Sequence, residues 1–504
     1  MLETITAALA RQARERPEAQ ALIAGGVRLT WREAKEWVDR ATGWFLALEL
    51  PRGAPVVGWL PNSVEWYLVR WACEQAGLFW VPVPTSQGSR ELMSILERVR
   101  PAVLLSPGRF RDRDYAAECD AMCSALSLKP VRLLLVEGSV LNLDGPVSGE
   151  GTALRLDEIA HALPTTGTEG IPKLAIYTLA AACERAHAQK RLLGLETNDM
   201  LLVLSPGTGP ARAAWLAAPV AGSCVVGMPI FSIDATLKLI EQERASIVCG
   251  TPAQLAMLAP KLNRTDTSSV RIWYTAGSVL PPTLAEELES QTHGIVLSTY
   301  GGADFGGWSA ADPSDTAFVR HTTVGKPRGS TELRIVDADG LDVALGKVGE
   351  LVGRGPCCVS GYVGIQGSES WKAGWFHTGD LAWIDMSGHI VIVGRLKEVI
   401  VRGGDKVSPS EVETVLRIHL GIDQVAIVGV PDPVLGERVC ACIVPTRSTQ
   451  APNLEELRDH LRREGLAPYK APELVLVLES LPMVGDKIDR RILAEMASRL
   501  TKVA

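Results

Sequence analysis

The sequence lacks an apolar run long enough to cross a membrane: no stretch approaches the roughly 18 residues that a spanning helix needs. The first 16 residues mix apolar and charged side chains in an amphipathic pattern, and they lack the apolar centre of a secretion signal. From these absences we expect a cytoplasmic protein with no membrane partner.

The sequence also lacks a basic excess and any CxxC pair. Lys and Arg number 51 against 58 Asp and Glu, so the net charge is -7. This balance excludes a general nucleic-acid binder, which would carry a basic surface. The ten cysteines are scattered, and even Cys440 and Cys442 stand in an apolar run. Dispersed cysteines in a long chain indicate reduced, buried residues and argue against a zinc site.

The 504 residues are too many for one compact core and favour at least two domains. Short apolar runs alternate with helical patterns, as in the strand 56–60, the helix 64–77 and the strand 79–83, which predicts an α/β fold. After residue 330 the pattern changes to strand pairs. We expect a large N-terminal region of packed sheets and helices, residues 1–396, and a smaller α+β domain, residues 397–504.

A loop rich in hydroxyls and glycine, Thr165 to Lys173, is the first candidate for chemistry. Glycine lets backbone N–H groups approach phosphate oxygens, and hydroxyls and lysine add donors and charge. The loop is not a Walker A motif, because Pro172 precedes the lysine and no Ser or Thr follows it. A surface turn explains the same residues equally well.

Three further signals are weak in isolation. Asp380 follows a Gly-rich segment and could accept hydrogen bonds from ribose hydroxyls, but a self-capped hairpin turn also fits. Arg395 stands between a strand and the change of domain, whereas Ser408 or Ser410 looks like an ordinary helix start. Lys487, near the C-terminus, would usually be a solvated charge.

The order and spacing of these segments resemble the acyl-adenylate-forming superfamily, which contains acyl-CoA synthetases, nonribosomal-peptide adenylation domains and beetle luciferases. The resemblance covers nearly the whole chain. The further segments that carry it are Leu29–Glu33, Pro61–Ser63, Gly349–Leu351, Gly355–Pro356, Gly361–Tyr362 and the stretch from Gly403–Gly404 to Glu413. The last of these is closest in style to acid–CoA ligases.

The resemblance implies an ATP-dependent acid–thiol ligase of the AMP-forming acyl-CoA synthetase type. The acid's carboxylate attacks the α-phosphorus of ATP bound with Mg²⁺, and pyrophosphate leaves. The thiol of CoA, or the pantetheine of a carrier protein, then attacks the acyl-adenylate, and AMP leaves. Between the two steps the C-terminal domain would rotate about a hinge at Lys397.

The resemblance also assigns roles to individual residues. The β- and γ-phosphates would be held by Thr165, Thr166, Gly167, Thr168, Gly170 and Lys173. The adenine would lie between Gly277 and the pair Tyr300 and Gly301, with Asp304 as the magnesium ligand. Asp380 would bind the ribose, Arg395 the ribose or phosphate, and Lys487 would be the catalytic lysine. Arg402, Gly403 and Gly404 would line the path of the pantetheine arm.

Several residues depart from the superfamily's usual pattern. Thr166 replaces Ser, Glu169 places an anion beside the triphosphate, and Ala303 and Asp304 stand where Thr and Glu are usual. Losses of this kind could weaken adenylation by several kcal/mol. They leave open an enzyme that only transfers a preformed acyl-adenylate to a thiol. A close alternative is an enzyme that loads a carrier protein, whose thiol is the same pantetheine. A non-catalytic nucleotide-binding protein is disfavoured by Lys487.

The acid would contact residues 205–215, 273–278 and 299–308. Phe305, Trp308 and the small residues beside them predict a roomy apolar pocket with an aromatic wall, which favours an aryl or cyclic acid over an amino acid. The partners expected are this small acid and, for the carrier-protein alternative, an acyl carrier protein. The composition leaves monomer and homodimer equally open.

Overall fold

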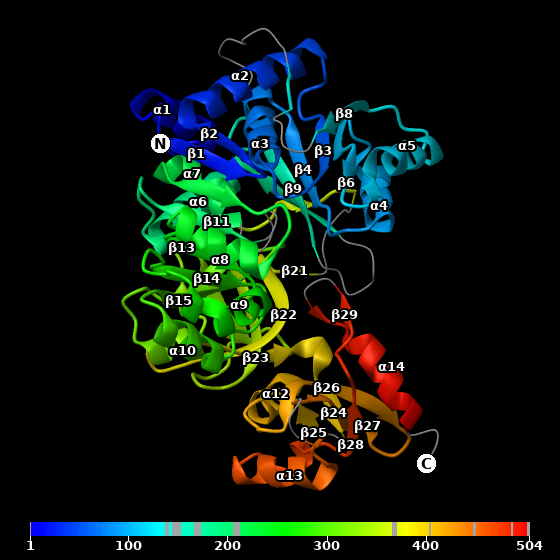
Figure 1. Cartoon of the computed structure of the whole chain (residues 1–504). Helices are drawn as coiled ribbons and strands as arrows, with labels where there is room; N and C mark the ends of the chain where they lie inside the picture. The colour runs from blue at the N-terminus through cyan, green and yellow to red at the C-terminus, as the bar shows by residue number, and fades with distance from the viewer. Residues whose placement is uncertain are drawn as a thin grey trace. The chain divides into compact units, whose positions relative to one another are not determined.

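The computed structural model describes residues 2–136, 141–143, 153–165, 173–204, 212–364, 370–402, 405–446, 450–484 and 487–500. The chain divides into two compact units (Figure 1). Unit 1 consists of Met1–Glu332 and Gly353–Phe376, and unit 2 of Leu333–Val352 and His377–Ala504. By packing, residues 377–396 therefore belong with the C-terminal residues. The domain boundary predicted at Lys397 is a hinge about which the C-terminal domain would rotate, and it remains a prediction.

The larger sheet of unit 1 has nine strands among the described residues. Its centre is parallel, because successive strands are joined through helices, and both edges are antiparallel. In spatial order the strands are β17 (Lys326–Pro327), β16 (Gly306–Ala310), β15 (Ile295–Gly302), β14 (Ile272–Ala276), β13 (Ile247–Gly250), β11 (Met200–Val203), β12 (Cys224–Gly227), β1 (Gln20–Ala24) and β2 (Val27–Thr30).

A second sheet of unit 1 has seven strands within the described ranges. They are, in spatial order, β20 (Gly361–Tyr362), β10 (Leu174–Thr178), β9 (Ile159–Pro164), β4 (Phe79–Pro84), β3 (Pro55–Leu60), β5 (Val103–Pro107) and β8 (Val131–Leu135). Strands β3, β4 and β5 are buried along almost their whole length, which explains their continuous apolar sequence. A short ribbon pairs β6 (Arg109–Phe110) with β7 (Arg113–Asp114).

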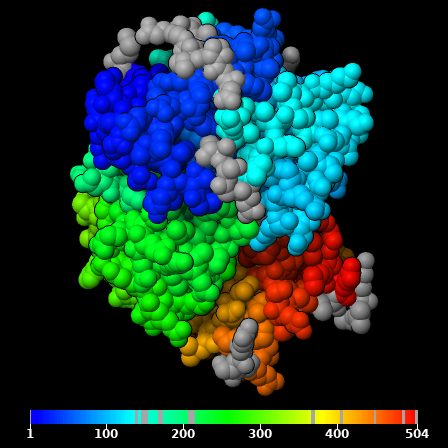
Figure 2. All heavy atoms as spheres, turned by 45° about the horizontal axis from the view of Figure 1, so that its top comes forward, coloured from blue at the N-terminus to red at the C-terminus, as the bar shows by residue number. Residues whose placement is uncertain are grey.

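Helices cover these sheets. They are α1 (Ile5–Glu15), α2 (Trp31–Ala47), α3 (Val64–Ala76), α4 (Ser89–Val99), α5 (Tyr115–Ala125), α6 (Leu179–Leu193), α7 (Arg212–Ala221), α8 (Ile233–Gln242), α9 (Pro252–Leu258), η2 (Ala259–Arg264), α10 (Pro282–Gln291) and α11 (Ala317–Thr322). Helix α1 lies against α7, where Gln12 donates to the carbonyl of Pro219 at 3.2 Å. Figure 2 shows the dark blue N-terminal residues directly beside the green segment.

Unit 2 is built around a sheet ordered β25 (Asp405–Val407), β24 (Ile400–Arg402), β27 (Gly436–Pro445) and β26 (Ile422–Asp432), with β28 (Leu474–Val477) also on β27. Its helices are α12 (Pro409–Leu416), α13 (Leu454–Arg463) and α14 (Arg490–Leu500), with short turns η3 (Leu396–Glu398) and η4 (Pro468–Lys470). Strands β29 (Met483–Val484) and β30 (Lys487–Ile488) form a small ribbon.

Another sheet pairs β18 (Glu332–Val336), β19 (Gly349–Arg354), β22 (Trp375–Ile384) and β21 (Trp371–Lys372), with β23 (Ile390–Arg395) beside β22. The chain passes between the units inside β18, β19 and β22. These are the strand pairs expected after residue 330.

Most predicted elements are confirmed within a residue or two, and two details differ. The first helix begins at Ile5, where Thr4 caps it by accepting from the N–H of Ala7. All ten cysteines are buried and free, as predicted, and burial raises the pKa of the Cys357 thiol to about 11. Ser408 does not cap α12 with its side chain. Among the described residues no helix is long and apolar enough to cross a bilayer.

Candidate functional site

The segment from Tyr300 to Asp304 lies at the carboxyl end of β15 in unit 1. Strand β14 runs parallel to β15, with Ala276 opposite Thr299, so Gly277 and Tyr300 follow at neighbouring strand ends. Ligands of parallel sheets bind outside the carboxyl ends of the strands. Gly277 has a φ of +95°, and a Cβ there would meet nothing within 4 Å. The structure thus brings together the two sides of the predicted adenine site, with open space on the Gly277 side.

Gly301 has no room for a side chain. It pairs with Gly307 just after a register shift, and a Cβ on it would come within 2.2 Å of the carbonyl oxygen of Gly306. The neighbouring backbone, rather than a flexible side chain, is the obstacle. Glycine is therefore required at position 301 for β15 and β16 to stay paired next to Tyr300.

Gly301→Ala is expected to push β16 away from β15 and to lower kcat/KM for ATP by about tenfold or more, since overpacking of this kind costs about 1–3 kcal/mol. Gly108→Ala serves as the control, because a Cβ at Gly108 meets nothing within 4 Å. Steady-state kinetics with varied ATP would measure the effect. Equal kinetics for the two variants would show that the strand pairing does not matter for ATP use.

Hydrogen bonds hold the loop after Tyr300 on two sides. The hydroxyl of buried Tyr177 donates to the carbonyl of Ala303. The N–H of Val359 donates to the carbonyl of Asp304 at 3.3 Å. The carboxylate of Asp304 is half-buried, and it extends from backbone anchored by two other parts of unit 1. This placement suits a group that must meet a ligand in a fixed position.

The residues that flank the predicted phosphate loop lie at adjoining strand ends. The N–H of Thr165, at the end of β9, donates to the carbonyl of Lys173, just before β10, at 2.8 Å. The Lys173 ammonium lies 5.7 Å from the centroid of the Tyr362 ring, within cation–π range. Lys173 is otherwise exposed and can turn toward an anion. Thr166, Gly167, Thr168 and Gly170 lie outside the described residues.

The rings predicted to form the aromatic wall of the acid pocket contact one another and two further aromatic rings. The ring of Phe305 lies 4.3 Å from that of Trp308 and 5.4 Å from that of Phe376, and Trp371 lies 5.5 Å from Phe376. Trp308 is fully buried. These rings therefore pack into one cluster, and the apolar pocket expected beside them stays a prediction. Residues 205–211, which were expected to complete the acid pocket, lie outside the described residues.

In unit 2, Asp380 and Arg395 face each other across β22 and β23. They are register partners, and Arg395 Nε lies 2.9 Å from an Asp380 carboxylate oxygen. The Asp380 side chain is 9% exposed. The hairpin alternative for Asp380 is wrong, because the residue lies inside β22 and the turn comes earlier, at Ala373 and Gly374, both with positive φ.

The predicted hinge follows directly on β23, with Lys397 in the turn η3. Ser408 Oγ donates to the carbonyl of Val393 at 2.6 Å, and Ser410 Oγ donates to the same oxygen. The serines thus fasten the end of β23 to the start of α12 instead of capping the helix. A Cβ on Gly394 would come within 2.7 Å of Ser408 Oγ, so this junction needs glycine.

The other predicted residues of unit 2 lie further along the chain. Arg402 forms two hydrogen bonds with Glu473, at 2.9 and 2.8 Å, and this bonding raises the pKa of Arg402. Lys487 belongs to β30, opposite Val484, but its side chain is outside the described part of the structure. Gly403 and Gly404 lie outside the described residues.

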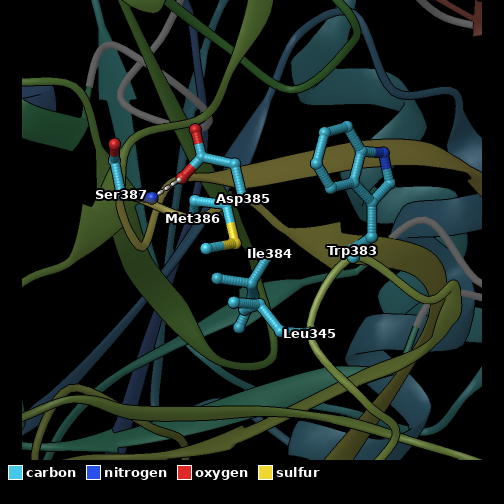
Figure 3. Close-up of a pocket in the computed structure, with 7 residues that line it drawn as sticks. Leu345, Trp383, Ile384, Asp385, Met386 and Ser387 are labelled. Carbon is cyan, nitrogen blue, oxygen red and sulfur yellow. Dashed lines mark hydrogen bonds between the residues drawn. The ribbon is translucent and has the colours of Figure 1, made fainter.

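A surface hollow of unit 2 contains none of the predicted residues. Leu345, Ile384 and Met386 gather there, while the N–H of Ser387 donates to Asp385 (Figure 3). Asp385 also accepts from His389. The hollow, about 290 Å³ in volume, therefore reads as an ordinary crevice between loops.

Sequence reasoning missed Arg185, Gln189 and Arg328, which line a small cavity of unit 1 beside Thr299 and Gly307. Arg185 and Gln189 are one helical turn apart in α6, on the face that turns inward. An arginine among alanines on an otherwise buried helix face is the signal that could have pointed to them.

Family models match most of the chain. One described as AMP-binding enzyme matches residues 9–363, and one described as AMP-binding enzyme C-terminal domain matches residues 411–486. The chain belongs to the family of AMP-binding enzymes. The resemblance noted from the sequence is thereby confirmed, and with it the enzyme class, an AMP-forming acyl-CoA ligase that uses ATP and CoA.

Two similar relatives of this AMP-binding enzyme act on ring-containing acids. The 3-[(3aS,4S,7aS)-7a-methyl-1,5-dioxo-octahydro-1H-inden-4-yl]propanoyl:CoA ligase of Mycobacterium tuberculosis is 30% identical, covering 95% of this chain and 96% of its own. The 2-hydroxy-7-methoxy-5-methyl-1-naphthoate–CoA ligase of Streptomyces carzinostaticus is also 30% identical, covering 98% and 93%.

A solved structure supports the same fold. ATP-bound MatB from Rhodopseudomonas palustris superimposes with a TM-score of 0.89 at 22% identity, covering 99% of this chain and all of its own. This confirms the predicted α/β fold with a large N-terminal and a smaller C-terminal part.

Proposed function

We propose that this AMP-binding enzyme joins an aryl or cyclic carboxylic acid to CoA through an acyl-adenylate. The observation that carries the proposal is the placement of Gly277 and Tyr300 at the carboxyl ends of adjacent parallel strands, with free space beside Gly277 and none beside Gly301. We expect the adenine base to bind in this space beside Gly277. The ring-containing acids of the two relatives support the substrate class.

In the first step the acid's carboxylate oxygen forms a bond to the α-phosphorus, and the bond to pyrophosphate breaks. Thr165 and Lys173, at the adjoining ends of β9 and β10, would hold the β- and γ-phosphates. Lys487 would stabilise the negative charge that shifts onto the phosphate oxygens. Asp380 would accept hydrogen bonds from the ribose hydroxyls, with Arg395 beside it to orient the carboxylate.

The donors of unit 1 fit a magnesium ion that arrives with ATP. Among the described residues no group of three His, Cys, Asp or Glu side chains could hold a metal. Mg²⁺ in nucleotide sites is commonly bound by one or two carboxylates together with phosphate oxygens and water. Asp304, on its anchored loop, would supply that carboxylate. The ion, when bound, offsets the charge of the phosphates.

In the second step the CoA thiol attacks the acyl carbon, and AMP leaves with the bonding electrons. We place the hinge at Lys397, next to the junction that Gly394, Ser408 and Ser410 fasten. Arg402 and the glycines after it would then contact the pantetheine arm. The ion pair of Arg402 with Glu473 holds this strand end in a defined position within unit 2.

The acceptor thiol is tested by incubating the enzyme with an aryl acid, ATP and either CoA or a pantetheine-loaded carrier protein. We expect one acyl-CoA and one AMP per ATP consumed. Thioester formation with the carrier protein but not with CoA would show that the acceptor is a protein. Thioester formation only from a synthetic acyl-adenylate would leave the second step as the sole activity, the outcome motivated by the missing hydroxyl at Ala303.

A further inference from the structure

The small cavity of unit 1 lies beneath α6, against β15 and β16. Its lining includes Arg185, Gln189, Thr299, Gly307, Arg328 and Cys357. The cavity is only about 20 Å³, the room of one or two waters, which suits one compact group. Thr299 and Gly307 belong to the segment predicted to contact the acid. The cavity therefore borders the segment predicted to contact the acid.

Arg185 points into this cavity without a partner. Its side chain is more than nine-tenths buried, and its Nε and Nη1 donors have no hydrogen-bond partner among the described residues. Gln189, one turn further along α6, donates to the hydroxyl of Tyr274 at 3.0 Å. Arg185 is thus the donor that remains unused on this face of the helix.

Arg328 brings a second positive charge to the cavity. It is half-buried, and this burial lowers its pKa. Neither arginine forms an ion pair within the described part of the chain, although Asp312 lies near enough to act on Arg328 electrostatically. Two cations that line one cavity, with no carboxylate among its lining residues, are unfavourable, because each loses water and repels the other. A bound anion would remove both costs.

Gly307 keeps the cavity open. A Cβ on this residue would lie 3.4 Å from Thr299 Cγ2, 3.8 Å from Arg185 Nη2 and 3.9 Å from Gln189 Nε2. A side chain at position 307 would therefore occupy the space in front of the Arg185 guanidinium and the Gln189 amide.

We propose that this cavity binds a second carboxylate on the acid substrate, so that the enzyme activates dicarboxylic acids at the end remote from Arg185. The inference rests on the proposed function and refines its substrate class. Arg185 would donate charge-assisted hydrogen bonds to the distal carboxylate, and Arg328 would add a second positive charge. The reacting carboxylate would lie toward Tyr300 and Asp304.

The test compares acids that differ only in the second carboxylate: terephthalate with benzoate, and adipate with hexanoate. In acid-dependent ATP–pyrophosphate exchange, the wild-type enzyme should prefer the dicarboxylate by about 100-fold in kcat/KM. Arg185→Met should remove most of that preference while changing kcat/KM for the monocarboxylate by no more than about threefold. Arg328→Met should reduce the preference by a smaller factor.

Arg90→Met is the control, since Arg90 is an exposed arginine of unit 1 that does not line the cavity. It should retain the preference. Equal use of mono- and dicarboxylates by the wild type, or equal loss of both in Arg185→Met, would overturn the proposal. Calorimetric binding of terephthalate and benzoate without ATP decides the matter independently. If no acid supports exchange, the proposed function fails, whereas binding specific for terephthalate and lost in Arg185→Met would still support the cavity.

Discussion

Replacing Lys487 with alanine is expected to lower acid-dependent adenylation by about 10²- to 10³-fold, the loss typical of removing one group that stabilises charge in the transition state. Lys487 would act only in the first step. The variant should therefore still convert a synthetic acyl-adenylate and CoA to the thioester at close to the wild-type rate. Separate assays of pyrophosphate exchange and of thioester formation from the adenylate would measure this split.

Lys347→Ala provides the matched control, because Lys347 is an exposed lysine of the same unit outside the predicted site. Both activities should survive in it. If Lys487→Ala lost both steps equally, a structural role for the β29–β30 ribbon would explain the result. If it lost neither, the assignment of Lys487 would be wrong.

Asp380→Ala is expected to lower kcat/KM for ATP by about 100-fold, corresponding to about 2.7 kcal/mol, while leaving the thermal midpoint nearly unchanged. The reason is that the buried carboxylate would lose its bonds to the ribose, whereas Arg395, 48% exposed, can turn to water. Kinetics with varied ATP at a saturating acid concentration would give the ratio.

Asp342→Ala is the control, because Asp342 forms a comparable ion pair with Arg334 at 2.6 Å in the same unit but is 65% exposed. It should use ATP normally. In the double variant Asp380→Ala, Arg395→Ala the losses should be less than additive, since the two residues act as one unit. Strict additivity would show that Asp380 and Arg395 act on ATP binding independently of the ion pair seen in the structure.

The regular elements could be read from the sequence because local pattern and fold agree there. The helix after residue 64 has apolar residues on a helical period and ends on Gly77, whose φ of 75° is the left-handed conformation of a helix terminus. The buried strands on either side are continuous apolar runs. In such segments local preference and tertiary packing select the same structure.

The parts that failed depend on contacts between distant residues. Ser408 and Ser410 have the sequence of a helix cap, but the carbonyl of Val393 competes for their hydroxyls. The sequence did not reveal that Phe376, from another strand, packs against Phe305 and Trp308. The cavity lined by Arg185 and Arg328 was missed because the sequence signal, an arginine among alanines, does not show which distant residues surround it.

The central claim is that this AMP-binding enzyme adenylates an acid by itself. The most direct measurement is the exchange of labelled pyrophosphate into ATP, with and without an aryl or cyclic acid, in the absence of CoA. We predict exchange that requires the acid, because the first step is reversible before a thiol arrives. Absence of exchange with every acid, alongside thioester formation from a synthetic acyl-adenylate, would contradict the account.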